Sequence, residues 1–402
     1  MSSYIFEYLV STLSPHHLAR QFKHYTTVLR NKKNLLETIS SLTKNNTVLT
    51  TTAQDLNLHR NTVLNRYSTL RQILSLDPLY FDTDRANLRA YSLYSNKRIT
   101  LQAGIVIQPN SVLHRGMQKL VQLIEQKSKG VILLNLHTLS MSGNNKLLFD
   151  LVSRNALDMA VLSTSVLNDA TNNRSKVLEL PFLFQSYNQA RKILNTRFLD
   201  IINASLSSGG IRCLGFWSMG WRYITSQDSP VLVPADLKNR KIRIMHNDTI
   251  SQYFEMMGAT PIKMHYGDVI KALQSGIVDS QENPYSNTLE MGFFKYQQFI
   301  TQLKYHLSVE SCIISKTRWN SLDAEHQEII ASAMNETTEW IFTEQQQFNQ
   351  KCKKILVEDH GLQLLTPSAK EEQQWRSHSL PLYKEYPHKD LLKLFSTTWS
   401  GA

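Results

Sequence analysis

The strand predicted around Arg243 carries the side chain best suited to bind an acid. In the run KIRIM, Ile242 and Ile244 alternate with Lys241 and Arg243, so one face is apolar and the other is basic. A guanidinium removed from water needs an acidic partner, and its planar fork matches a carboxylate through two parallel hydrogen bonds. That partner is either a carboxylate of the protein, in an internal salt bridge, or the carboxylate of a ligand.

A second basic cluster begins the helix predicted over residues 59–74. One arc of this helix is apolar: Val63, Tyr67, Leu70, Ile73 and Leu74. The opposite arc is polar and uncharged: Asn61, Asn65, Ser68 and Gln72. Arg60 flanks this polar arc on one side, and Thr62 and Arg66 flank it on the other. Such side chains can read bases in the DNA major groove and hold phosphates.

The segment before this helix supports the same interpretation. A short helix is predicted over about residues 51–56, and Asn57 and Leu58 form a tight turn. A short helix, a turn and a helix that begins with Arg, Asn and Thr are typical of a helix-turn-helix. The alternative is a helical bundle whose amide-rich face has no function.

Catalytic or metal-binding clusters are not predicted. The pair His16 and His17 has no third ligand nearby, so we expect it to lie in a loop or cap. The cysteines are odd in number and far apart, which argues against a disulfide framework and indicates buried thiols in a reducing compartment: Cys213, Cys312 and Cys352.

Charge and composition limit the class of protein. With 402 residues, 42% hydrophobic and 19% charged, the chain is an ordinary globular protein of two or three domains. The net charge of +11 is uneven, because residues 1–98 hold 13 Lys or Arg against 6 Asp or Glu. A basic N-terminal part on a nearly balanced remainder suggests that this part meets a polyanion. The first residues resemble no secretory signal, and no apolar run reaches about 18 residues, so we expect a cytoplasmic protein without a membrane partner.

Helices alone are predicted from residue 35 to 94, and strands alternate with helices from residue 99. Strands are expected at 99–107, 131–137 and 157–163, then at 211–216, 241–245, 258–264 and 276–284. Two successive α/β sets imply mostly parallel sheets and a cleft between two lobes. From residue 322 two amphipathic helices are predicted, and Gly361 ends the second.

The run from TTAQDLNLHRNTVLNRYSTLRQIL to LDPLYFDTDRANLRAYSLY resembles the C-terminal helix-turn-helix domain of the purine-catabolism and sugar-diacid regulators (PucR and CdaR types). The resemblance covers about residues 25–95. It implies that the residues that contact DNA are Arg60, Asn61, Thr62, Asn65 and Arg66.

Residues 99–361 resemble the solute-binding proteins of tripartite ATP-independent periplasmic (TRAP) transporters, the DctP-like family. The most specific match is VIKALQSGIVDSQENP, supported by LELPFLF, PADLKNRKIRI and MGATPIKM. The resemblance implies a ligand carboxylate held by Arg243 and Arg222, with Asn283 of QENP and Tyr266 lining the same site. It also places Asp279 and Glu282 in a structural segment, which argues against an acid–base pair. Asn145 and Ser163 stand where sialic-acid-binding relatives carry acids, so another organic or sugar acid is expected.

The sequence therefore predicts an α/β protein with an all-α helix-turn-helix domain at 1–98 and a two-lobed, periplasmic-binding-protein-like domain at 99–402. Lobe I is expected at about 99–221 with part of the C-terminal helices, and lobe II at about 222–310. We expect a one-component, homodimeric transcriptional regulator that binds operator DNA and a small carboxylate-bearing metabolite, without enzyme activity or cofactor. One alternative is an extracytoplasmic TRAP receptor with an N-terminal extension; another is a DNA-binding protein whose clamshell only dimerises.

Overall fold

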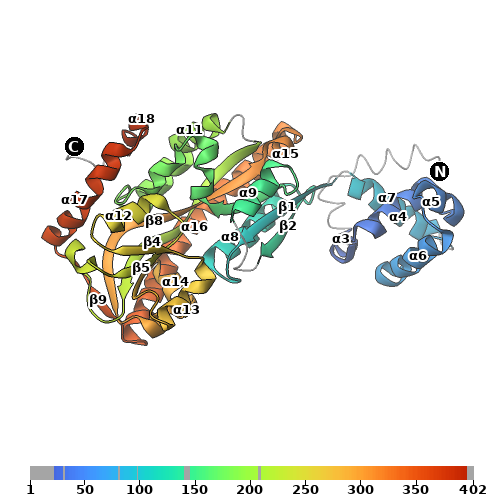
Figure 1. Cartoon of the computed structure of the whole chain (residues 1–402). Coiled ribbons are helices and arrows are strands. Elements are labelled where there is room, and N and C mark those ends of the chain that lie inside the picture. The colour runs from blue at the N-terminus through green and yellow to red at the C-terminus, as the bar shows by residue number, and fades with distance from the viewer. Residues whose placement is uncertain are drawn as a thin grey trace. The chain divides into compact units, whose positions relative to one another are not determined.

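The computed structural model describes residues 22–29, 32–79, 82–96, 98–139, 145–206 and 210–395 (Figure 1). His16 and His17 lie outside these residues. Contacts divide the chain into one unit of residues 1–101 with 123–134, and a second of residues 102–122 with 135–402. Within the described ranges, no helix combines the length and apolar character needed to span a bilayer.

The N-terminal helical domain, called the head below, has five described helices: α3 (Lys23–Leu29), α4 (Lys33–Lys44), α5 (Leu49–Asp55), α6 (Arg60–Leu74) and α7 (Asp82–Asn96). Their apolar faces enclose one core, in which α6 contributes Tyr67, Leu70 and Leu74. Val63 is also buried, whereas Ile73 is only half-buried. The apolar arc predicted for α6 is thus confirmed as its inner face.

Local side-chain contacts set the turn between α5 and α6. Asn57 has a φ of 52°, a left-handed conformation that asparagine tolerates better than most residues. The ring of His59 then accepts a hydrogen bond from the backbone N–H of Asn61 and caps the start of α6. Asp55 ties the end of α5 to α4, because it accepts from Ser41 Oγ at 2.6 Å and from Lys44 Nζ at 2.9 Å.

The second part of the chain is built on one nine-stranded sheet. Its strands are β1 (Ile99–Val106), β2 (Ile132–Leu139), β3 (Met159–Ser163), β4 (Ile211–Ser226), β5 (Lys241–Ile244), β6 (Thr260–Lys263), β7 (Ser280–Asn283), β8 (Phe299–Ser315) and β9 (Gln363–Leu365). The order is β2-β1-β3-β8-β4-β7-β5-β6, and β9 pairs with β8. β1 with β3, and β5 with both β6 and β7, are parallel, as the sequence predicted.

Two long antiparallel strands join these parallel arms. β4 has 16 residues and β8 has 17, whereas the sequence predicted only a short strand at 211–216. β8 pairs with β3 on one side and β4 pairs with β7 on the other, both antiparallel. The β4–β8 register shifts at three places, between residues 213 and 215, 218 and 220, and 222 and 224. The expected parallel sheets are therefore continuous with each other through β4 and β8.

Helices pack on this sheet (Figure 1). They are α8 (Val112–Lys127), α9 (Asn145–Ser153), α10 (Tyr187–Ile193), α11 (Leu199–Ser205), α12 (Asp248–Glu255), α13 (Val269–Gln274), α14 (Tyr285–Glu290), α15 (Lys316–Asn320), α16 (Ala324–Glu358), α17 (Ala369–Glu385) and α18 (Lys389–Leu392). The two C-terminal helices predicted from residue 322 form one continuous helix of 35 residues, α16. Its buried side includes Ile330, Ile341 and Leu356, and it packs against β4 and α14.

Candidate functional site

A cavity of about 740 Å³ lies over the sheet in the second unit. All four predicted ligand-binding residues line it: Arg222, Arg243, Tyr266 and Asn283. Arg222 comes from β4, Asn283 from β7 and Arg243 from β5, while Tyr266 follows β6. Because β4, β7, β5 and β6 are successive neighbours in the sheet, residues far apart in the sequence meet at one wall of the cavity.

Arg243 is a buried cation in that wall, and none of the described carboxylates forms an ion pair with it, although Glu282 acts on it from a distance. Its residue is only 3% exposed, and its Nη2 donates to the backbone carbonyl of Met264 at 2.8 Å. Its Nε is buried without a hydrogen-bond partner, and no carboxylate among the described residues lies within ion-pair distance of it. Burial, with repulsion from Arg222, lowers the pKa of Arg243 to about 10, so it remains charged at neutral pH. Within the described ranges, Arg243 therefore lacks the internal salt bridge that was one alternative for it.

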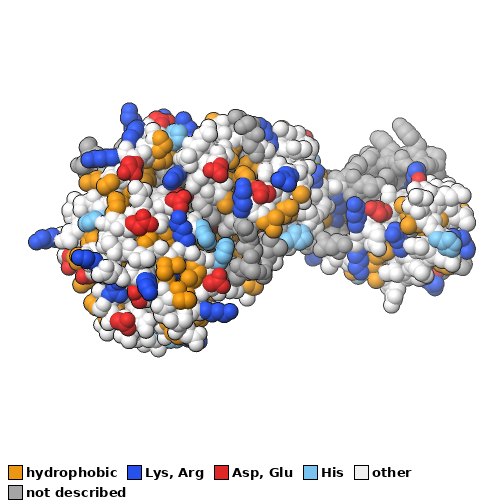
Figure 2. Space-filling view, in the orientation of Figure 1, with side chains coloured by type: hydrophobic (Ala, Val, Ile, Leu, Met, Phe, Trp, Pro, Cys, Tyr) orange, Lys and Arg blue, Asp and Glu red, His pale blue; other side chains and the backbone are white. Residues whose placement is uncertain are grey.

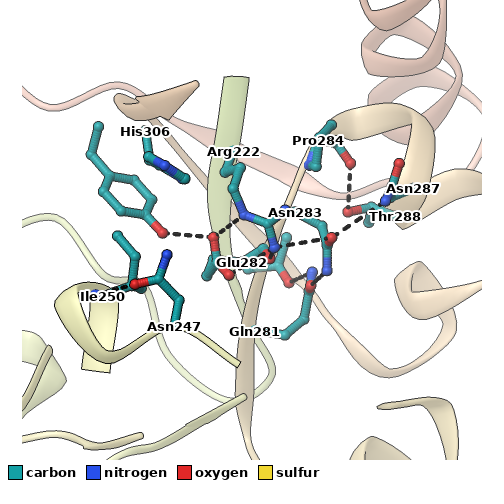
Figure 3. A network of polar contacts seen from close by, with 12 residues as sticks. Arg222, Asn247, Ile250, Gln281, Glu282, Asn283, Pro284, Asn287, Thr288 and His306 are labelled. Carbon is teal, nitrogen blue, oxygen red and sulfur yellow. Dashed lines mark hydrogen bonds and ion pairs between the residues drawn. The ribbon is translucent and has the colours of Figure 1, made fainter. Parts of the chain in front are cut away.

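Arg222, by contrast, forms an ion pair with a carboxylate of the protein. Glu282 pairs with its Nε and accepts from its Nη2 at 2.7 Å, and the backbone carbonyl of Glu282 accepts from the same Nη2 at 2.6 Å (Figure 3). Burial alone would lower the pKa of Arg222, but Glu282 more than offsets this and the pKa is raised. Tyr305 donates to Glu282 at 2.6 Å. Arg222 thus lines the cavity with its charge already neutralised.

The polar strand β7 lies between β4, which carries Arg222, and β5, which carries Arg243. All four of its residues are buried, and their side chains find partners within the sheet. Gln281 donates to Thr225 at 2.7 Å, and Asn283 donates to Gln281 at 2.5 Å. The amide oxygen of Asn283 accepts from Arg222 at 3.2 Å, so its orientation is fixed (Figure 3). Hydrogen bonds thus hold the QENP segment in place, and Asn283 is its residue that lines the cavity.

His306 of β8 is buried beside Tyr305. Its Nε2 lies 3.2 Å from the carbonyl oxygen of Leu178. Burial, with the nearby charge of Arg222, lowers the pKa of His306 to about 4, so the ring is neutral at physiological pH. No additional positive charge is therefore placed beside Arg222.

The rim of the cavity carries ionisable groups that the sequence analysis did not single out. The rings of His246 and His265 lie 4.8 Å apart, and Lys263 is ion-paired with Asp248. Burial and repulsion from His265 lower the pKa of His246. Glu179 also lines the cavity and accepts from Asn168 at 2.7 Å and from Thr249 at 3.0 Å. These acids are thus already hydrogen-bonded.

Glu310 is a further cavity residue that sequence reasoning missed. It lies on β8, opposite Ser163 of β3 and Trp217 of β4. Burial raises its pKa to about 8, although Arg222 counteracts this. The signal that could have found it is an acid within the mostly apolar stretch HLSVESCIIS, where the neighbouring residues are buried.

The predicted DNA-contacting residues lie at the start of α6. Arg60, Asn61, Thr62 and Asn65 are exposed, as a groove-reading face requires. Arg66 is only partly exposed, and its Nη1 lies 3.2 Å from the carbonyl oxygen of Asn34 on α4. Figure 2 shows basic side chains spread over the visible part of the head with few acids among them. The side chain of Arg66 thus bonds to α4 within the head, whereas the side chains of the other four predicted contact residues are exposed.

Other candidate chemistries gain no support. No group of three or more metal-ligating side chains occurs in the described ranges. The free cysteines are all buried, and burial raises the pKa of each thiol: Cys213, Cys312 and Cys352. Asp279 accepts from Ser280 and from the N–H of Lys241, while Glu282 holds Arg222. The two carboxylates therefore have separate structural partners.

Two family models match the chain. Residues 103–390 match the model of the bacterial extracellular solute-binding proteins of family 7, DctP. Residues 35–90 match the model of the PucR C-terminal helix-turn-helix domain. Both resemblances noted in the sequence are thereby confirmed.

Individual relatives agree with the first of these matches. The chain is 28% identical over 313 residues to the C4-dicarboxylate-binding protein DctB of Bacillus subtilis, covering 77% of this chain and 86% of the relative. It is 30% identical over 251 residues to the 2,3-diketo-L-gulonate-binding periplasmic protein YiaO of Escherichia coli, covering 62% of this chain and 76% of the relative.

Solved structures share the fold. A TRAP periplasmic solute-binding protein of Shewanella oneidensis with bound succinate superposes with a TM-score of 0.69 at 24% identity, covering 75% of this chain and 99% of that one. Another TRAP periplasmic solute-binding protein, from a Sulfitobacter species with bound β-D-galacturonate, gives a TM-score of 0.68 at 21% identity, covering 74% of this chain and 99% of that one.

Proposed function

Because the chain belongs to the bacterial extracellular solute-binding proteins of family 7 and also carries a PucR C-terminal helix-turn-helix domain, we propose that it is a one-component transcriptional regulator. In this proposal the head binds operator DNA and the cavity senses a small organic or sugar acid. It acts in the bacterial cytoplasm, where the DNA is, and as a homodimer that engages two half-sites.

The unbalanced charge of Arg243 is the observation that carries the sensor half of this proposal. A buried guanidinium without an acid is costly, and the free Nε leaves one of its donors unused. A ligand carboxylate in the cavity would balance the charge and accept from that donor. Asn283 and Tyr266 flank this position, and relatives are named for, or bound to, compounds that carry carboxylates.

Ligand binding would act on the head through closure of the cavity. An acid that binds the closed form more tightly shifts the population toward closure. A coupling of about 1–3 kcal/mol between cavity and head changes DNA affinity by about 5- to 150-fold. Exposed Arg60, Asn61, Thr62 and Asn65 supply the groove contacts in this proposal.

Binding of succinate and D-galacturonate, measured by calorimetry and thermal shift on the full chain, tests the sensor half. We expect at least one acid to raise the melting temperature, and Arg243→Ala to weaken its binding about tenfold or more. Arg212→Ala is the matched control, because Arg212 is exposed and stacks on Trp319 away from the cavity. No binding, or equal losses in both variants, would contradict the sensor role and favour a clamshell that serves only dimerisation.

A salt-dependent gel shift with the DNA upstream of the neighbouring genes tests the head. We expect Arg60→Ala and Asn61→Ala to abolish the preference for that DNA over unrelated sequence, with each base contact contributing about 1–3 kcal/mol. Lys33→Ala removes an equally exposed charge from α4 and is the control. If all three variants bind like the wild type, the groove assignment is wrong. If the wild type does not bind DNA at all, the extracytoplasmic receptor becomes the better explanation.

A further inference from the structure

Glu310 lines the cavity and has no partner among the residues that the structure describes. The side chain makes no hydrogen bond or ion pair with any described residue, whereas Glu179 and Glu282 are each held by two or more donors. Glu310 lies in the interior of β8, which is covered at both edges by β3 and β4, and it lines the cavity. The residue is half-buried, and a carboxyl that lacks a partner there is stabilised by a ligand group that forms a hydrogen bond with it.

The groups around Glu310 do not neutralise it. Its cross-strand neighbours, Ser163 and Trp217, carry no charge. Arg222 of β4 is the cation that acts on it, but Arg222 already pairs with Glu282. Cys312, two residues along β8, remains a thiol because burial raises its pKa well above the ordinary value. Among the described residues, Arg243 therefore lines the cavity as a buried cation without an ion pair, and Glu310 lines it as a carboxyl without a hydrogen bond or ion pair.

We propose that Glu310 determines the ligand class of this cavity by hydrogen-bonding a hydroxyl of the bound acid and excluding a second carboxylate. The ligand is then a hydroxylated monocarboxylate, such as a sugar acid, with its carboxylate on Arg243. This inference rests on the proposed sensor function and adds the selectivity that Arg243 alone does not provide.

The end of the ligand that faces Glu310 is either a hydroxyl or a second carboxylate, and the chemistry of these two groups supports the proposed selection. A hydroxyl can donate to a Glu310 carboxylate and can also accept from its protonated form, so it fits Glu310 in either state. A second carboxylate fits only while Glu310 keeps its proton, and it meets an unscreened like charge once Glu310 ionises. Burial places that ionisation at a pKa of about 8, close to the pH of the cell. The preference for a hydroxyl should therefore increase as the pH rises.

Calorimetric titration with D-galacturonate and with succinate at about pH 7 and about pH 9 tests the inference on the full-length chain. The readout is the ratio of the two dissociation constants, because a loss of charge on Arg243 affects both acids alike. Glu310 is mostly protonated at about pH 7 and mostly ionised at about pH 9, so we expect the ratio to shift about tenfold in favour of D-galacturonate between the two pH values. Glu310→Gln keeps a hydrogen-bonding amide but cannot ionise, so its ratio should change less than about twofold.

Three outcomes separate this inference from the proposed function. If both acids bind, Arg243→Ala weakens both, and the ratio shows the same pH dependence in wild type and Glu310→Gln, the role of Glu310 is overturned and the sensor stands. If succinate binds better than D-galacturonate at both pH values, the role of Glu310 is likewise overturned. If neither acid binds the wild type, the proposed function and this inference fall together. Should Glu310→Gln not fold, a constant ratio in the wild type is sufficient to reject the inference.

Discussion

Arg222 on β4 and Glu282 on β7 neutralise each other inside the protein, where their side chains are 3% and 1% exposed. Because Glu282 neutralises Arg222, Arg222 contributes its shape and its hydrogen-bond donors to the cavity wall, but no net charge. The neighbouring Arg243 has no such partner. Two arginines that look alike in the sequence thus differ in the structure: Arg222 is paired within the sheet, and Arg243 is the one that we propose binds a ligand.

Loss of the acid from the Arg222 pair should destabilise the second unit strongly. In Glu282→Gln a buried guanidinium loses its counter-charge, and we expect the free energy of unfolding to fall by about 3–5 kcal/mol. Urea denaturation followed by circular dichroism measures this. Glu358→Gln is the control, since Lys354 and Glu358 form an exposed pair on α16 that should contribute less than about 1 kcal/mol. Similar losses in both variants would show that the buried pair is not important for stability.

Removal of the charge from Arg243 should have the opposite effect on the ligand-free protein. Arg243→Met fills a similar volume without a buried charge, so we expect it to raise the free energy of unfolding by about 0.5–2 kcal/mol. The same variant should lose the thermal shift that an acid produces in the wild type. A fall in stability would indicate that the hydrogen bond to Met264 outweighs the cost of the charge.

Glu310 should make stability depend on pH. Its pKa is about 8 in the folded chain against 4.5 ordinarily, so between these values the folded chain keeps a proton that the unfolded chain has lost. The contribution of Glu310 to the free energy of unfolding therefore falls as the pH rises from about 4.5 to 8, and above about pH 8 this contribution is constant.

Comparison with Glu310→Gln isolates this contribution from the other titrating groups. We expect the variant to gain more than about 1 kcal/mol relative to wild type between about pH 5 and pH 8, measured by urea denaturation at each pH. His306 titrates in both proteins and cancels in the difference. Parallel pH profiles would mean that Glu310 ionises normally in the folded state.

Arg66 should behave differently from its neighbours on α6. Its guanidinium bonds to the carbonyl of Asn34 and to Thr38, so Arg66→Ala should lower the stability of the head by about 0.5–1.5 kcal/mol. In gel shifts it should weaken binding to specific and unrelated DNA equally, whereas Asn61→Ala should reduce the specific complex selectively. A selective loss in Arg66→Ala would return this arginine to the groove-reading set.

Local pattern was sufficient for the head and for the parallel strands, but it missed β8. The apolar spacing of α6 predicted Val63, Tyr67, Leu70 and Leu74 as buried because a helix face is fixed by sequence spacing. Asn335 separates two amphipathic patterns in the sequence, yet α16 continues through it. Packing on β4 and α14 along the length of the helix outweighs the low helix propensity of one asparagine.

The distribution of charge in the cavity could not be predicted from local pattern. Arg222 and Glu282 are 60 residues apart, and they meet because β4 and β7 are neighbours in the sheet. That strand order is a long-range property, so the sequence could not assign the internal salt bridge to Arg222 rather than to Arg243. Glu310 was missed for the same reason: its lack of a partner becomes visible only when every element around it is in place.

Irregular pairing of two long strands increases the local twist of the sheet that carries the cavity. β4 and β8 run through both arms, and their register shifts at three places, the last of them beside Arg222. If a ligand closes the cavity as we propose, β4 and β8 would have to twist, and the shift beside Arg222 is a place where their pairing is already irregular. The Arg222–Glu282 pair would then lie where the sheet changes its twist on ligand binding.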